Sequence, residues 1–329
     1  MDKKNSELRH SEVGESLIGE RFKVLDKGFV SLVSYHGTDK LVEAAARVSY
    51  QKGTRSVNDT NNLLRFLYSH GHTSPFEICN LTFHMKLPLY VIQQVLRHRT
   101  AKLNQESHRY SEISYDFHIV GDGEWRMQSD NNKQGSEGVL NNIDGSYLAE
   151  DEIEHIYQAE QLYKDRLEKG VAKEQARKDI PHSVYSQMYW QMDLKNLLGF
   201  MSLRCDSHAQ QEIREYANVI AGIVKELYPL VFEAWYDYHY QSVTYSRPER
   251  LLMDEYIRGF ANSGMNQLAP SEHVEWNKRN DEFKAHIDQY ATQLGLGKRE
   301  LQEFRDKFTR PTEQDFNLDY SKIIDMEKE

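Results

Sequence analysis

The chain of 329 residues has little of several features that define other classes of protein. Its two cysteines, Cys79 and Cys205, are too few for a disulfide framework or a four-thiolate zinc site. No apolar run approaches the roughly 18–20 residues that span a bilayer, and the first residues contain no apolar stretch typical of a secretory signal. We therefore expect a cytoplasmic protein in a reducing compartment, without a membrane partner.

Positive charge is also in short supply, because 41 Lys and Arg stand against 51 Asp and Glu and the net charge is −10. General binding of nucleic acid requires a cationic face that neutralises phosphates. We therefore expect no nucleic-acid partner, although a small cationic pocket remains compatible with this balance. The length allows one large domain or two, and 13 Phe and 20 Tyr supply material for a substantial core.

Hydrophobic periodicity predicts an α+β fold that is mostly helical, with a small, mainly antiparallel sheet. Strands are expected at 29–33, 81–87 and 110–119, the second because apolar and polar residues alternate there. Helices are expected at 41–48, 60–69, 89–98, 147–169, 173–192 and 206–238, with Asp39 and Asp206 as N-caps of the first and last. A further helix carries an apolar stripe at Trp276, Phe283, Ile287, Tyr290 and Leu294, and a shorter one carries Leu301, Phe304 and Phe308.

Composition divides the chain into three parts. Residues 1–19 are polar and charged, and are expected to form a flexible tail. Residues 20–240 form the principal domain, with a surface insertion at about 120–146 that is rich in Gly, Asp, Asn and Ser. Residues 241–329 form a helical C-terminal extension to which the sequence assigns no role.

Chemistry-bearing residues are concentrated between positions 97 and 110. This window contains Arg97, Arg99, Lys102 and Arg109 against one acid, Glu106, in a chain that is acidic as a whole. Guanidinium groups match the geometry of phosphate, so the window predicts a pocket for an anionic ligand. The alternative is that these arginines cap a helix C-terminus or form surface salt bridges.

A second cationic group supports the pocket. Arg177 and Arg204 lie in two later segments, and Arg204 directly precedes the expected start of the 206–238 helix. Free N–H groups at a helix N-terminus favour an anion. We therefore predict an anion site at which the guanidinium group of Arg204 lies beside the free N–H groups at the start of this helix.

The spacing of Arg97-His98-Arg99 and Ser107-x-Arg109 fits the pattern R-H-R-x7-S-x-R, and in this the chain resembles the flavin-dependent thymidylate synthases. The segments 70–77 (HGHTSPFE) and 203–210 (LRCDSHAQ) resemble the family's other binding elements, in the same order. The resemblance covers roughly residues 25–240. It implies a homotetramer with sites at subunit junctions.

The resemblance implies an enzyme that methylates dUMP to dTMP, with FAD as cofactor and with NADPH and methylenetetrahydrofolate as co-substrates. Arg204 is the implied catalytic residue, since a cation beside the uracil stabilises negative charge on the ring. The dUMP-binding residues it implies are Gln94, Arg97, Gln105, Glu106, Ser107, Arg109, Arg177 and Arg204. The FAD-binding residues it implies are Ser49, His72, Ser74, Glu77, Arg97, His98, Arg99, Asn104, Gln105, Asp193, Lys195, Gly199 and His208.

Some positions differ from the family pattern and keep a second hypothesis open. Gln105 stands where the family often has Glu, and Asp193, Lys195 and Gly199 replace residues of its flavin-facing wall. The alternative is a non-catalytic nucleotide-binding or assembly paralogue that keeps the dUMP pocket without flavin chemistry.

Other catalytic chemistries are less well supported by the sequence. His70-x-His72 lacks a third spaced ligand, so no metal is expected. Cys205 beside Arg204 could be a nucleophile with a lowered pKa, and Ser107 could be one only with an activating base. We interpret Cys205 as a small structural residue and Ser107 as a substrate ligand.

Overall fold

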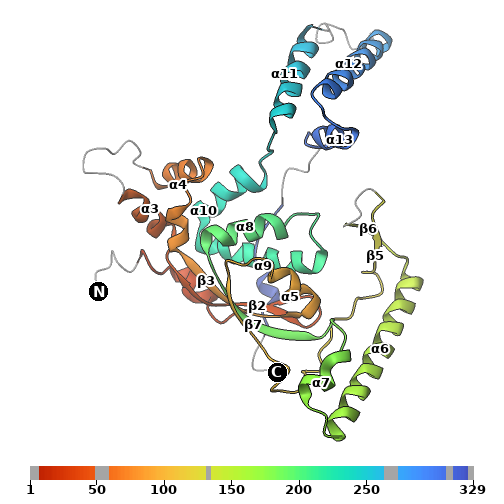
Figure 1. Ribbon diagram of the computed structural model, residues 1–329. Helices are drawn as coiled ribbons and strands as arrows, with labels where there is room; N and C mark the ends of the chain where they lie inside the picture. The colour runs from red at the N-terminus through yellow and green to blue at the C-terminus, as the bar shows by residue number, and fades with distance from the viewer. Residues whose placement is uncertain (1–6, 49–58, 131–134, 263–272, 309–313, 325–329) are drawn as a thin grey trace. The chain divides into compact units, whose positions relative to one another are not determined.

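A computed structural model describes residues 7–48, 59–130, 135–262, 273–308 and 314–324 (Figure 1). The chain forms two compact units. The first contains residues up to Tyr240 together with the segment that begins at Asp315, and the second contains Gln241–Gln314. The expected C-terminal extension is therefore divided, since its last part belongs to the first unit.

A five-stranded antiparallel sheet is the centre of the first unit, and the predicted α+β class is confirmed. Its strand order is β1-β2-β3-β7-β4, formed by β1 (Arg21–Val24), β2 (Gly28–His36), β3 (Asn80–Pro88), β7 (Tyr185–Asp193) and β4 (Lys102–Gln105). The alternation predicted for 81–87 is present, because Leu81, Phe83, Met85 and Leu87 are buried and the residues between them are half-buried.

Strand β7 corrects the helix predicted at 173–192. Only α7 (Lys173–Ala176) and a 3₁₀ turn, Arg177–Asp179, are helical there. The segment from Tyr185 buries Met188, Trp190 and Met192 and leaves the residues between them more exposed. This is the two-residue period of a strand, and it places Trp190 opposite Phe83 of β3.

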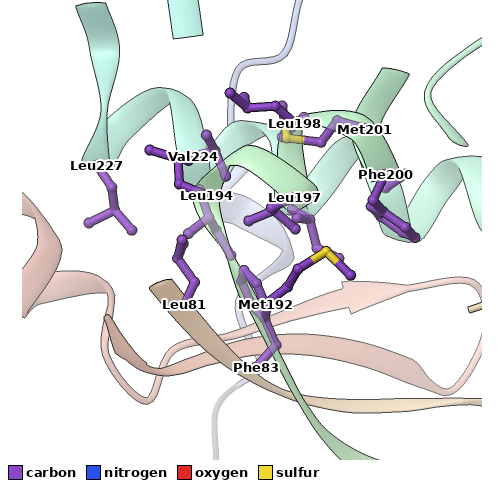
Figure 2. Packing of buried hydrophobic residues seen from close by; sticks show 14 of the residues in the cluster. Leu81, Phe83, Met192, Leu194, Leu197, Leu198, Phe200, Met201, Val224 and Leu227 are labelled. Atoms are coloured by element: carbon purple, nitrogen blue, oxygen red, sulfur yellow. The ribbon is translucent and has the colours of Figure 1, made fainter. Parts of the chain in front are cut away.

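Helices cover the apolar face of the sheet (Figure 1). The helices of the first unit are α2 (Glu12–Leu17), α3 (Asp39–Arg47), α4 (Thr60–Ser69), the 3₁₀ helix Ser74–Ile78, α5 (Leu89–Val95), α6 (Asn142–Glu168), α7, α8 (Leu194–Arg204), α9 (Gln211–Leu227), α10 (Pro229–Trp235), the π-helix Tyr236–Tyr240 and the 3₁₀ turn Tyr320–Lys322. Figure 2 shows Leu194 and Leu197 of α8 over Leu81, Phe83 and Met192 of the sheet. This packing fixes α8, and with it Arg204, against the sheet.

Two expected helix starts are wrong. Asp206 does not begin a helix, because α9 starts only at Gln211 and the chain breaks again at Tyr228 before α10. Asp39 lies in the first turn of α3, and its carboxylate accepts hydrogen bonds from the N–H groups of Leu230 (3.0 Å) and Val231 (3.1 Å). It therefore satisfies N–H groups in the first turn of α10, which are far away in sequence.

The segments 110–119 and 120–146 also differ from expectation. Residues 110–119 form no regular strand, and only Phe117 makes an isolated bridge, to Val184. The insertion carries a small hairpin of β5 (Arg126–Gln128) and β6 (Ser136–Val139), and α6 begins at its end. Most side chains of the hairpin are exposed, in keeping with a surface insertion.

Both ends of the first unit pack on its core. Helix α2 lies within the expected tail 1–19 and buries Leu17. Near the other end, Phe316 is buried against Trp235 and Tyr240, with ring centroids 5.9 and 5.3 Å away. Ile323 forms a bridge to Phe22 of β1.

The second unit is helical and has its own small core. It contains α11 (Arg247–Asn262), α12 (His273–Gln293) and α13 (Lys298–Asp306). The core is formed by Leu252, Phe283, Ile287, Ala291 and Phe304, so part of the predicted apolar stripe is buried within this unit.

Candidate active site

The arginine window begins where α5 ends. Helix α5 is only seven residues long, and the next turn is made by hydrogen bonds from the N–H of Arg97 to the oxygen of Gln94 (3.3 Å) and from the N–H of His98 to that of Val95 (3.0 Å). Within the described residues, the exposed guanidinium groups of Arg97 and Arg99 make no hydrogen bond or ion pair. They are free to bind an anion.

Arg204 reaches this turn from α8. Its Nε donates to Nε2 of His98 at 3.0 Å, and its Nη2 donates to the backbone oxygen of Gln94 at 3.3 Å. Burial and, as the smaller cause, the charge of Arg204 together lower the pKa of His98 to about 4. His98 is therefore neutral at pH 7 and can accept this bond, which orients Arg204 without cancelling its charge. We call Gln94, His98 and Arg204 the α5–α8 cluster.

The predicted helix-start environment of Arg204 is wrong. Arg204 is the last residue of α8, where carbonyl groups rather than N–H groups are unpaired. Asp206, two residues later, accepts hydrogen bonds from the backbone N–H and ring of His208. Arg204 therefore contributes the charge of its side chain and has no helix N-terminus directly after it.

A second cluster forms where the loop after β4 meets α7. The guanidinium group of Arg109 pairs with Glu174 at 2.9 Å, and Nζ of Lys173 donates to the backbone oxygen of Tyr110 at 3.3 Å. These contacts place the loop residues Glu106–Arg109 beside Arg177, which follows α7 directly. Burial lowers the pKa of His108; the charge of Glu106 opposes this shift and the charge of Arg177 adds to it. We call Glu106, Ser107, His108, Arg109 and Arg177 the β4–α7 cluster.

The two clusters are separate within one chain. No hydrogen bond or ion pair among the described side chains joins their members, and Figure 1 shows α7 well apart from α8. Between them, Gln105 lies on β4 and donates to Oγ of Ser186 at 3.4 Å. The residues predicted to hold dUMP are thus divided into two groups.

The predicted flavin residues occupy several surfaces. Ser49 lies outside the described residues. His72, Ser74 and Glu77 lie exposed at the turn after α4 and in the 3₁₀ helix that follows, and Asn104 lies on β4 opposite Tyr189. His208 is exposed next to Asp206.

The three positions that differ from the family lie at the start of α8 and along it. Asp193 is the N-cap of this helix, and its carboxylate accepts from the N–H and the side-chain amide of Asn196 at 2.9 and 2.6 Å. Lys195 is half-buried, and Gly199 is exposed with no atom within 4 Å of where a Cβ would stand. Asp193 therefore has a structural role, and Gly199 leaves open space on the helix.

Sequence reasoning missed Gln210, His108 and Tyr163. Gln210 accepts a 2.7 Å bond from the Gln94 side chain. His108 is only 5% exposed, which its place between Ser107 and Arg109 did not indicate. Tyr163 lies on α6, more than fifty residues after His108 in the sequence. No local sequence pattern could have predicted that it lies beside the β4–α7 cluster.

A groove lies beside the loop that carries His208. Its volume is about 490 Å³, and it runs between the hairpin and the start of α9. Arg126 spans it, donating to Oε1 of Gln211 at 2.9 Å. Within the described residues, no group of three or more His, Cys, Asp or Glu side chains could hold a metal ion, and no helix there is long and apolar enough to cross a membrane.

The side chains present suit an anionic dinucleotide such as FAD. Arg97 and Arg99 are exposed cations without bound carboxylates, and guanidinium forks match pyrophosphate oxygens. His72, Ser74 and His208 add exposed hydrogen-bonding groups.

The fold and these clusters define an α+β protein with an arginine-rich site suited to an anionic ligand. A family model described as thymidylate synthase complementing protein matches residues 31–230, and the chain belongs to this family. Among its relatives, the flavin-dependent thymidylate synthase of Wolbachia pipientis wMel is 40% identical over 245 residues, which cover 74% of this chain and 86% of the relative. That of Treponema denticola is 41% identical over 244 residues, covering 73% and 91%.

Solved structures agree with this assignment. The UMP/dUMP methylase PolB from Streptomyces cacaoi, bound with 5-Br UMP, has a TM-score of 0.60 and 29% identity, covering 68% of this chain and 99% of that chain. The same methylase bound with 5-Br dUMP has a TM-score of 0.59 and 28% identity, covering 66% and 97%.

Proposed function

We propose that this chain is a flavin-dependent thymidylate synthase that methylates dUMP to dTMP in the cytoplasm, with methylenetetrahydrofolate as the one-carbon donor and NADPH as the reductant. The observation that carries the proposal is the pairing of Arg204 with a neutral His98 inside the R-H-R motif, in a chain about 40% identical to enzymes of that name. The two free, buried cysteines suit a reducing compartment.

FAD would be held by the exposed arginines and by the other flavin positions inferred from the sequence. When bound, FAD would supply the redox chemistry of the reaction, with NADPH as the source of the electrons. Arg97 and Arg99 would bind its pyrophosphate group. Asp193 contributes indirectly, because it caps the helix on which Lys195 and Gly199 lie.

Arg204 acts on the uracil. The ring must gain negative charge before C5 attacks an electrophilic carbon, and a fixed cation at its polar edge stabilises that charge. His98 and the Gln94 carbonyl hold the guanidinium group in place before substrate arrives, so little reorganisation is needed. Arg109, Arg177 and Ser107 bind the anionic part of dUMP.

We further propose that the enzyme is a homotetramer in which the α5–α8 cluster of one protomer faces the β4–α7 cluster of another. In this arrangement the predicted dUMP-binding residues, which form two separate clusters within one chain, would come together in one site between two protomers. Inactive variants Arg204→Ala and Arg177→Ala, co-expressed in equal amounts, should then regain activity in about a quarter of the sites. Absence of any recovery in mixed oligomers of proven composition would refute shared sites.

The activity itself is tested with the purified chain. We expect the absorption bands of a bound flavin, and formation of dTMP only when dUMP, methylenetetrahydrofolate and NADPH are all present. Calorimetry with dUMP and FAD separately distinguishes the non-catalytic alternative. Binding of dUMP by a protein that takes up no FAD would establish that alternative and exclude the proposed reaction.

A further inference from the structure

Two polar atoms in and beside the β4–α7 cluster are buried without a hydrogen-bond partner in the described part of the chain. They are Nε2 of His108 and the hydroxyl of Tyr163, in residues that are 5% and 1% exposed. Buried polar groups are nearly always paired, because an unpaired one loses its hydration without compensation. Two such atoms near one arginine indicate partners that form only in a complex.

Both residues lie next to the segment that carries Arg177. The Arg109–Glu174 pair joins the loop of His108 to α7, and Tyr163 packs in one buried cluster with Ala176, which directly precedes Arg177. Burial lowers the pKa of His108, with Glu106 opposing the shift and Arg177 adding to it. Burial raises the pKa of Tyr163, which the nearby backbone N–H of Ile113 and the charge of Arg177 lower. A guanidinium group has five donors and no acceptor. A neutral imidazole nitrogen and a phenol oxygen are both acceptors, so the three side chains are chemically complementary.

The same protein already contains such a pair. In the α5–α8 cluster, Arg204 donates to Nε2 of the neutral His98 at 3.0 Å, and no carboxylate among the described residues is bonded to its guanidinium group. In the β4–α7 cluster, Glu106 lies 3.9 Å from His108, too far for a hydrogen bond. The bound carboxylate of this cluster, Glu174, is on Arg109.

We propose that His108 and Tyr163 are positioning residues for Arg177, and that they accept hydrogen bonds from its guanidinium group when dUMP binds. This inference rests on the proposed function. Neutral acceptors fix the direction of the guanidinium group and leave its charge available to the nucleotide, whereas a carboxylate would neutralise it. Contacts of this kind are often open in the free protein and close in the substrate complex.

The test uses the full-length flavin-loaded protein and compares Tyr163→Phe, His108→Phe and His108→Gln with the wild type. Tyr163→Phe and His108→Phe should each raise the Kd and KM for dUMP about tenfold, the size expected for losing a hydrogen bond to a charged group, and kcat should stay within about twofold. His108→Gln keeps an acceptor and should restore most of the affinity.

Tyr115→Phe is the matched control. Its ring lies 6.1 Å from that of Tyr163, and Lys164 lies over it, so this change removes a neighbouring hydroxyl outside the cluster. It should leave KM and kcat unchanged.

Wild-type affinity for dUMP in Tyr163→Phe, which is nearly isosteric and should fold, would overturn the proposal. So would equal losses in Tyr115→Phe, or a fall in melting temperature and kcat without a change in KM. The proposed function is judged separately, since wild-type protein that binds no dUMP would refute it before any variant is compared.

Discussion

Arg204 offers the sharpest test of how the site works. Replacement by Ala removes a cation that the structure holds by both an imidazole and a backbone carbonyl. Loss of a preorganised donor to developing negative charge costs about 2.7–4 kcal/mol in the transition state. We expect kcat for dTMP formation to fall about 10²- to 10³-fold.

The same change also affects stability. It leaves Nε2 of His98 and the Gln94 oxygen without their donor, which should lower the free energy of unfolding by about 1–3 kcal/mol. For a domain of this size, that corresponds to a fall in melting temperature of about 2–12 °C. The pKa of His98 should rise from about 4 but stay below its usual value, because burial is the larger cause of its shift. Imidazole NMR measures this directly.

Two further variants make the Arg204 experiment decisive. Arg204→Lys keeps the charge and loses the planar fork, so its rate should lie between those of wild type and Arg204→Ala. Arg214→Ala removes an arginine nearby in sequence that donates to the Ser207 oxygen at 2.8 Å. Arg214 is not among the residues assigned to dUMP, so this variant should keep kcat. Normal turnover by Arg204→Ala, or equal loss in Arg214→Ala, would refute the assigned role.

Three other outcomes follow from burial and charge. Burial raises the pKa of Asp39 to about 6 from 3.8, so its contribution to stability is present below about pH 4 and is lost as pH rises to about 6; melting curves of Asp39→Asn should lack that slope. The folded pKa of His98, about 4, lies below its unfolded value of about 6.5, so wild type loses stability as pH falls between these values, and His98→Gln should lose less in the same melting series. Phe316→Ala should destabilise the first unit by about 3–5 kcal/mol in chemical unfolding, because the Phe316 side chain is only 3% exposed. Phe308→Ala, at a side chain that is 58% exposed, should not have this effect. Equal effects of the two changes would contradict the packing of Phe316.

Local sequence patterns predict the secondary structure of this chain better than they predict contacts between distant segments. Strand β3 can be predicted from the alternation of Leu81, Phe83 and Met85 with polar residues. The same alternation is present in β7, where polar Gln187 and Gln191 flank buried Met188 and Trp190. The helix predicted there reflects a period assigned wrongly over a short apolar segment.

Capping residues illustrate the same limit. Asp39 and Asp206 both match the residue type of an N-cap, yet one pairs with the distant α10 and the other with the adjacent His208. Residue type predicts that a carboxylate will accept N–H bonds, and tertiary packing decides from which segment. For this reason the sequence could mark Arg204 as a candidate and still misplace it at the start of a helix.

Charge balance explains why histidine recurs beside these arginines. With a net charge of −10, the chain has many carboxylates that could pair with its cations, and Arg109 already pairs with Glu174. A site for a nucleotide monophosphate must keep some guanidinium groups positioned but uncompensated. A buried, neutral imidazole meets both needs, since it accepts a hydrogen bond and brings no negative charge, and burial itself keeps it neutral. His98 serves Arg204 in this way, and the same physical requirement applies to Arg177, which shares its cluster with the buried His108.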